Sequence, residues 1–219
     1  MIKITELSKR IKKEEVLNSI SYTFNKGNIY GLTGRNGSGK TMLLRAISGL
    51  IYPTTGMIEI EGKKLHHEIS FPPSIGLTIE NTNLLPQFDA FTNLKILAKI
   101  KNIASKQDII KSIDRVGLNP YSTLKVKKFS LGMKQRLSIA QAIFEKPNII
   151  LLDEPTNAID EDGVKLVRNL LLEEKARGAT IIIASHHRED VKILADECLH
   201  MDNGTIIYQT MNNNKSVLL

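Results

Sequence analysis

The chain has a single cysteine, no tryptophan and no long hydrophobic run. One cysteine, Cys198, cannot form an internal disulfide, which indicates a reducing compartment. The apolar runs, such as Ile149–Leu152 and Ile181–Ala184, have the length of strands and fall far short of the roughly 18 residues that a membrane-spanning helix needs. Residues 1–10 also lack the apolar core of a signal peptide. We therefore expect a protein that does not span a bilayer and stays in the compartment where it is made.

Aromatic side chains are also scarce, at 5% of 219 residues, and the formal net charge is +7. A positive balance favours an acidic partner, without choosing among nucleic acid, an anionic membrane face and a nucleotide. The basic clusters at 9–13 and 125–128 are not interleaved with aromatic residues, as a base-stacking surface requires. We expect no nucleic-acid partner.

A glycine-rich segment carries the most specific pattern in the chain. Its residues follow GxxxxGK[ST]: Gly34, Arg35, Asn36, Gly37, Ser38, Gly39, Lys40 and Thr41. Glycines let backbone N–H groups turn inward around an anion, and the helix that follows adds partial positive charge. We expect Lys40 to reach the outer phosphates of a nucleoside triphosphate and Thr41 to offer its hydroxyl to Mg2+.

Extended and helical patterns alternate along the chain and predict an α/β fold. The expected strands are Ile2–Leu7, Val16–Phe24, Asn28–Thr33, Met57–Glu61, Asn148–Leu152 and Thr180–Ser185. The expected helices are Thr41–Ser48, Phe91–Ile100, Ser105–Val116, Gly132–Phe144, Asp162–Arg177 and Arg188–Ala195, followed by a hairpin that turns at 202–204. Gly49 is the expected C-cap of the first of these helices, and Ser105 and Asp108 are expected to form a capping box at the start of the third. Strands such as Asn148–Leu152, which are apolar throughout, suit a parallel sheet covered on both faces.

Two carboxylates, Asp153 and Glu154, follow the apolar strand that ends at Leu152. Ligands gather at the carboxyl ends of parallel strands. Asp153 would hold Mg2+ there, and Glu154 would orient or deprotonate the water that attacks the terminal phosphate. The alternative is an acidic turn after a buried strand, but a phosphate loop on the same chain favours the catalytic role.

A second helix start lies upstream, where Ser130 has the character of an N-cap and the free N–H groups near Gly132 form a second candidate anion site. Taken alone, this is an ordinary helix start. However, Ser130–Arg136 followed by Leu152–Asn157 resembles the signature and Walker B regions of ABC-type ATPases. The resemblance extends from about Ile2 to Tyr208, which is nearly the whole chain.

The resemblance implies a P-loop NTPase fold of the ABC ATPase type, with a mixed, mostly parallel sheet, additional antiparallel strands and an inserted helical subdomain. It implies one domain over 1–219, with the nucleotide-binding core in 1–78 and 145–219 and the helical signature subdomain at about 79–144. Two such chains would enclose two ATP molecules, with the signature of one subunit over the Walker A loop of the other.

The family's functional residues are carried over by motif. The nucleotide-binding set is Gly34–Thr41 with the adjacent Met42, and Ser130 and Gly132 of the signature, which spans Ser130–Gln135. The catalytic set is Lys40, Glu154 and His186, the last matching the switch histidine that senses the terminal phosphate. Thr41 and Asp153 would hold Mg2+, and Asn157–Asp160 match the D-loop. Taken alone, a histidine at a strand end is usually a solvated residue, and we interpret the adjacent His187 in that way.

The chain departs from the family pattern at two positions. The family has an aromatic residue near position 11 that stacks on adenine, where this chain has Ile11; alternatively, Ile11 is a core residue turned away from the site. The family's Q-loop glutamine is replaced by Glu80, whose carboxylate is a further candidate Mg2+ ligand. Residues 79–94 also resemble the bacitracin and lantibiotic-resistance exporter group.

The implied function is ATP hydrolysis that powers transport, with export favoured, through a separate integral membrane subunit. The implied cofactors are ATP and Mg2+, the assembly is a homodimer or a heterodimer of ATPase subunits, and the location is cytoplasmic, on the inner face of the cell membrane. Two interpretations remain open beside it: a soluble ABC-type ATPase in iron–sulfur cluster assembly, and a nucleotide-dependent module on nucleic acid.

Overall fold

A computed structural model of the protein describes residues 1–80, 84–186 and 188–211, without the side chains of 188–190. The strands are β1 (Ile2–Ile11), β2 (Glu14–Phe24), β3 (Ile29–Thr33), β4 (Thr55–Ile60), β5 (Lys63–Lys64), β6 (Ile75–Thr78), β7 (Ile149–Asp153), β8 (Thr180–Ala184), β9 (Glu197–Asp202) and β10 (Thr205–Met211). The helices are α1 (Lys40–Ile47), α2 (Ala90–Lys101), α3 (Lys106–Arg115), α4 (Leu131–Ile143), α5 (Glu161–Ala176) and α6 (Arg188–Leu194), with a 3-10 turn at Val126–Lys128.

A six-stranded sheet runs through the middle of the described chain in the order β10-β9-β3-β8-β7-β6. The four pairings from β9 to β6 are parallel, and β10 pairs antiparallel with β9. Every residue of β3 and of β8 is buried. These strands are covered on both faces, as the continuous apolar runs predicted.

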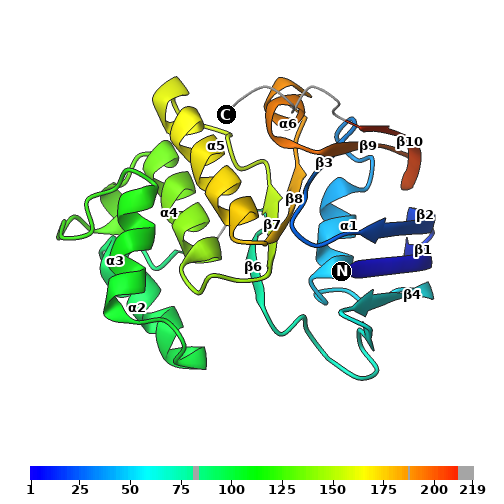
Figure 1. Ribbon diagram of the computed structural model, residues 1–219, viewed down its shortest axis with the longest axis horizontal. Coiled ribbons are helices and arrows are strands. Elements are labelled where there is room, and N and C mark those ends of the chain that lie inside the picture. Colours follow the sequence, from blue (N-terminus) through cyan, green and yellow to red (C-terminus); the bar gives the residue numbers. More distant parts are fainter. Residues whose placement is uncertain (81–83, 187, 212–219) are drawn as a thin grey trace.

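A smaller antiparallel sheet, in the order β2-β1-β4-β5, lies beside α1 (Figure 1). Its long strand β1 contains irregular register steps toward β2, between Ile4 and Leu7 and again around Lys9. Such bulges disturb the period-two alternation of side chains. For this reason the sequence pattern showed only the first part of this strand, Ile2–Leu7. The two-residue strand β5 was not predicted, because it is too short to show a pattern.

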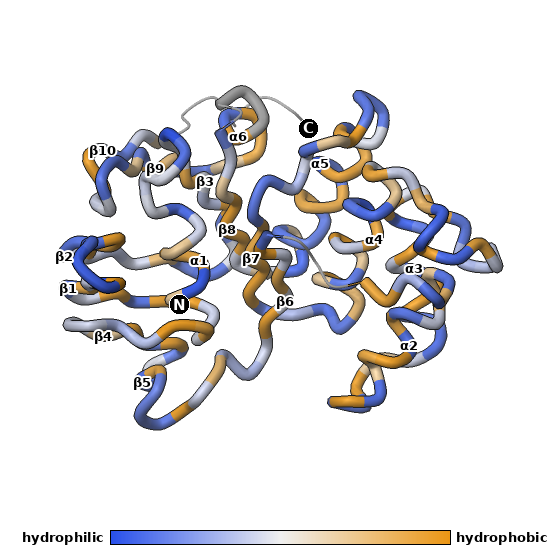
Figure 2. Tube along the Cα trace, turned by 180° about the vertical axis from the view of Figure 1, so that it is seen from behind, coloured by the Kyte–Doolittle hydropathy of each residue, from blue (hydrophilic) through white to orange (hydrophobic). Residues whose placement is uncertain are grey.

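Two hydrophobic clusters cover opposite faces of the larger sheet. Ile181 and Ile183 of β8 belong to the cluster that includes α2–α6, whereas Ile182 and Ala184 belong to the cluster of α1 and the antiparallel sheet. Figure 2 shows hydrophobic colour along β6, β7 and β8, the strands between the two layers. Successive side chains of β8 therefore point to opposite faces of the sheet, and the strand contributes to both hydrophobic clusters.

The helix starts follow local capping rules. Ser105 and Asp108 form the expected capping box at α3, Asp89 caps α2, and the Ser130 hydroxyl accepts a hydrogen bond from the Met133 N–H at α4. Gly49 has φ +82° directly after the C-cap of α1, as its position suggested. None of the helices in the described part of the chain is both long and apolar enough to cross a membrane.

The parallel strands bring their carboxyl ends to the same edge of the sheet. Gly34 follows β3, Glu154 follows β7, and Ser185 follows β8. Glu80 lies two residues beyond β6, whose Thr78 is paired with Leu152 of β7. This edge therefore collects the residues that the sequence singled out.

Candidate functional site

The phosphate loop connects β3 to α1 and depends on glycine at two close approaches. A Cβ atom at Gly34 would lie 2.2 Å from the Met201 carbonyl oxygen, and one at Gly39 would lie 2.9 Å from the Val16 carbonyl oxygen. Both glycines also have φ in the left-handed half of the map, at +147° and +102°. The loop is therefore seated between β2 and the β9–β10 hairpin in a conformation that a larger residue would strain.

Lys40 lies inside this loop, with 6% of its surface exposed. Its ammonium donates to the carbonyl oxygens of Gly34 at 2.8 Å and Arg35 at 3.0 Å. Burial lowers the pKa of Lys40 below its ordinary value, while the nearby carboxylates of Glu154 and Asp153 oppose that shift. The cation is held by neutral acceptors, which leaves its charge available to an anion.

Thr41 and Asp153 are in contact, as expected for two residues that share a metal ion. The Thr41 hydroxyl donates to the Asp153 Oδ2 atom at 2.7 Å. Burial raises the pKa of Asp153, and the carboxylates of Glu154 and Glu80 act in the same direction, whereas the Thr41 hydrogen bond and Lys40 oppose it. A hydroxyl and a carboxylate are hard oxygen ligands, which are the donors that Mg2+ prefers.

Glu154 is joined to His186 on the neighbouring strand end. One carboxylate oxygen, Oε1, accepts from the His186 backbone N–H at 2.9 Å and lies 2.8 Å from His186 Nδ1, and Oε2 accepts from the Ser185 hydroxyl at 3.2 Å. Glu154 itself has φ +49°. The resemblance assigned roles to both residues, but the sequence did not predict their contact. His187 lies outside the described residues.

The start of α4 lies against the segment that follows β7. The Gln135 amide donates to the carbonyl oxygens of Glu154 and Pro155, at 3.2 and 3.3 Å. A Cβ atom at Gly132 would lie 2.7 Å from the Ala158 carbonyl oxygen. Leu131 is 69% exposed. The signature residues at the start of α4 are thus held against residues 154–158, while Leu131 is exposed to solvent.

Glu80 is bonded to a residue that the sequence did not single out. The Arg45 guanidinium of α1 donates to Glu80 Oε2 at 2.6 Å. Glu80 also has a left-handed backbone, with φ +57°. Its expected role as a Mg2+ ligand remains a prediction, and the described contact directs its carboxylate to Arg45.

A hollow of about 460 Å³ lies over the phosphate loop. Its lining is Glu14, Val16, residues 36–42, Asp153 and Glu154. The structure therefore brings Asn36 to Met42 together with both carboxylates. The other predicted site residues lie outside this lining: Gly34, Arg35, Glu80, Ser130, Gly132 and His186. Glu14 and Val16 were not predicted, because no local pattern marks two residues of an ordinary strand as ligand contacts.

The hollow is suited to a phosphate group. The Ser38 hydroxyl is buried, with no hydrogen-bond partner among the described residues. The first turn of α1 has no side-chain cap, because its N-cap is Gly39. A buried unpaired hydroxyl is costly and free N–H groups at a helix start attract anions, so a bound phosphate would satisfy both.

Ile11 lies at the end of β1 and is 42% exposed. The alternative prediction, that Ile11 is a core residue turned away from the site, is therefore wrong. Ile11 is paired in register with Glu14 of β2, and Glu14 lines the hollow. Ile11 therefore lies beside the rim of the site, without an aromatic ring.

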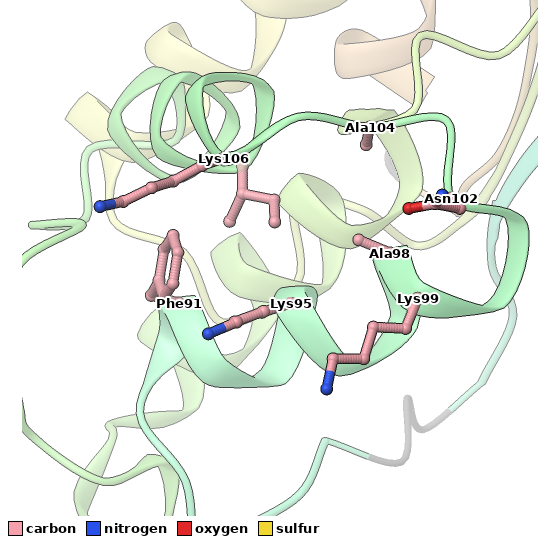
Figure 3. A pocket seen from close by; sticks show the side chains of 8 residues that line it. Phe91, Lys95, Ala98, Lys99, Asn102, Ala104 and Lys106 are labelled. Carbon is pink, nitrogen blue, oxygen red and sulfur yellow. The ribbon is translucent and has the colours of Figure 1, made fainter.

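A second hollow, of about 290 Å³, lies between α2 and α3. Its apolar lining includes Phe91 and Ala98, and Lys95, Lys99 and Lys106 surround it (Figure 3). It shares no lining residue with the hollow over the phosphate loop, so it is not part of the nucleotide site.

Comparison with known proteins places the chain among ABC transporter components. The ABC transporter family model matches residues 17–157. The uncharacterized ABC transporter ATP-binding protein YybJ of Bacillus subtilis (strain 168) is 67% identical over 206 residues, which is 94% of each chain. The lantibiotic transport ATP-binding protein SrtF of Streptococcus pyogenes is 35% identical (95% of this chain, 90% of the relative), and the bacitracin transport ATP-binding protein BcrA of Bacillus licheniformis is 38% identical (94% and 68%).

Solved structures confirm the predicted P-loop fold. The dimeric structure of MJ0796, a bacterial ABC transporter cassette, superimposes with a TM-score of 0.90 at 23% identity, and covers 98% of this chain and 100% of that chain. The relatives confirm the predicted family and its likeness to bacitracin and lantibiotic transport proteins. The chain belongs to the ABC transporter family, as an ATP-binding subunit built as an ABC ATPase cassette.

Proposed function

We propose that this ATPase powers export through a separate integral membrane subunit, with Mg2+ as its metal cofactor. The observation that carries the catalytic part is the meeting of Lys40, the Thr41–Asp153 pair and the Glu154–His186 pair at one edge of the sheet. Export is supported by the likeness to SrtF and BcrA, which are described as lantibiotic and bacitracin transport proteins.

Each residue of the site has a distinct task in phosphoryl transfer to water. The loop N–H groups and Lys40 bind the phosphates, and Thr41 and Asp153 hold the Mg2+ ion, which supplies charge neutralisation at the phosphates when bound. Glu154 orients the attacking water and accepts its proton. His186 holds Glu154 through its backbone N–H and its ring, and we assign to it the response to the terminal phosphate that the family resemblance implies.

The assembly we propose is a dimer of ATPase subunits, either identical or related, that encloses two ATP molecules. In support, Ser130 and Gly132 do not line the hollow of their own chain. Leu131 between them is exposed, which supports contact of a second subunit with the start of α4. Within each subunit we propose a core formed by 1–78 and 145–219 and a helical subdomain at about 79–144, whose helices α2–α4 gather at one end of the molecule (Figure 1).

We propose that the protein lies on the cytoplasmic face of the cell membrane, bound to its membrane subunit. The test is to purify the tagged protein from native membranes in mild detergent, with a tagged unrelated ATPase as the control. Co-purification of an integral membrane chain with the tagged protein alone supports transport. Recovery with a soluble scaffold or with nucleic acid would instead support the assembly-factor or nucleic-acid interpretation.

Ile11→Tyr is expected to raise ATP affinity about fivefold, because a ring at the rim of the site stacks on adenine. Stacking on an aromatic side chain contributes roughly 1–3 kcal/mol per base, of which we expect about 1 kcal/mol beyond the isoleucine contact. The melting temperature should stay unchanged, since the Ile11 side chain is exposed. Calorimetric titration with ATP in the presence of Mg2+ measures the affinity, and thermal unfolding measures the melting temperature. Ile11→Val, which adds no ring, is the control, and unchanged ATP binding in Ile11→Tyr would contradict stacking.

A further inference from the structure

Arg45 and Glu80 form an ion pair between α1 and the end of β6. The guanidinium Nη2 atom lies 2.6 Å from Glu80 Oε2, and the two side chains are 34% and 57% exposed. Arg45 is five residues beyond Lys40 on the helix that begins in the phosphate loop. The pair therefore joins the helix that binds phosphate to the strand end beside Asp153.

Glu80 lies at the same edge of the sheet as Asp153 and Glu154. Thr78, the last residue of β6, is paired with Leu152 of β7. Glu80 and Glu154 each lie two residues beyond this pair, so they occupy equivalent positions on neighbouring strands. Glu80 therefore lies at the strand end next to the one that carries Asp153, which is where Thr41 and Asp153 would hold a metal ion.

A third carboxylate at this edge would oppose a triphosphate. Asp153 and Glu154 already line the hollow, and Lys40 is the cation inside the loop. In a partly screened environment, a unit charge about 10 Å away changes the affinity for an anion roughly three- to tenfold. Arg45 neutralises Glu80 at close range, so the glutamate is accommodated without that repulsion.

We propose that Arg45 is a positioning residue for Glu80: it holds the Glu80 carboxylate against α1 and cancels its charge, so that the pair sets how strongly nucleotide binding depends on Mg2+. This inference rests on the nucleotide site of the proposed function, and is independent of transport and of the membrane partner. The Mg2+ ion is then left to Thr41 and Asp153, whose contact does not involve Glu80.

The test uses Arg45→Gln, Glu80→Gln and the double variant, with ADP as the probe so that hydrolysis does not intervene. Dissociation constants are measured by calorimetry with EDTA and with excess Mg2+. Arg45→Gln should weaken metal-free ADP binding about three- to tenfold, because Glu80 is left uncompensated, and Mg2+ should restore most of the loss. Glu80→Gln should strengthen metal-free binding by a similar factor, because Arg45 is released. The double variant should return to within about twofold of the natural protein.

The controls separate this role from a structural one. Lys26→Gln and Glu61→Gln break another exposed ion pair, 2.8 Å long, and should change neither constant. Arg45→Lys should retain near-natural affinity, since it keeps the charge. Exposed ion pairs contribute little to the free energy of folding, so all variants should have the same melting temperature as the natural protein. A double variant that binds metal-free ADP as weakly as Arg45→Gln would overturn the proposal, and so would equal effects with and without Mg2+. Failure of the natural protein to bind ADP would instead overturn the nucleotide site itself.

Discussion

Glu154→Gln is expected to slow ATP hydrolysis about a hundred- to ten-thousand-fold while ATP binding stays near that of the natural protein. Glutamine keeps the size of the side chain, and its carbonyl oxygen still accepts the hydrogen bond from the His186 backbone N–H. It loses the basic oxygen that would take a proton from water. Phosphate release measures the first effect, and titration with a non-hydrolysable ATP analogue measures the second.

The same variant also tests the assembly. Because hydrolysis is slow, Glu154→Gln should accumulate as a nucleotide-bound dimer when ATP is present, which size-exclusion chromatography with light scattering detects. Glu61→Gln is the control, since Glu61 does not line the site and its variant should hydrolyse ATP normally. Near-natural turnover in Glu154→Gln would refute the role of Glu154. A monomer at every ATP concentration would refute the two-ATP dimer.

The phosphate loop and the helix caps were predictable because both are local. The spacing from Gly34 to Thr41 alone specifies a loop that enters a helix, and the Ser105–Asp108 capping box is closed within four consecutive residues. Such features depend on the backbone conformation of one short segment. The sequence therefore predicted them independently of how the strands are ordered.

The contacts that assemble the site were not predictable in the same way. The Glu154–His186 contact joins residues 32 positions apart, and the Arg45–Glu80 pair joins residues 35 positions apart. The first contact depends on β7 lying beside β8 in register, and the second on α1 packing against the sheet whose next strand is β6. A family resemblance assigns roles to single residues, but it does not supply a partner such as Arg45 where the chain departs from the pattern at Glu80.

Lys40→Ala is expected to reduce ATP turnover below about 1% of the natural rate and to weaken ATP binding by about ten- to a hundredfold. The ammonium is the buried cation of the loop and is held by the Gly34 and Arg35 carbonyl oxygens. A charge-assisted hydrogen bond contributes roughly 1.5–3 kcal/mol, and alanine removes the donor. The loop also loses the side chain that ties its two carbonyl groups to α1, so its binding conformation is less fixed.

Binding and turnover must be measured together in Lys40→Ala, because the two activities fail for different reasons in the variants of this site. The loss in Lys40→Ala should appear in both the ATP dissociation constant and the rate, whereas Glu154→Gln should lose the rate alone. Lys26→Ala removes an exposed lysine that is paired with Glu61, and should leave both values unchanged. Circular dichroism should show that Lys40→Ala keeps the fold. If a folded Lys40→Ala protein binds and hydrolyses ATP at near-natural levels, the phosphates are not held where the loop and α1 meet.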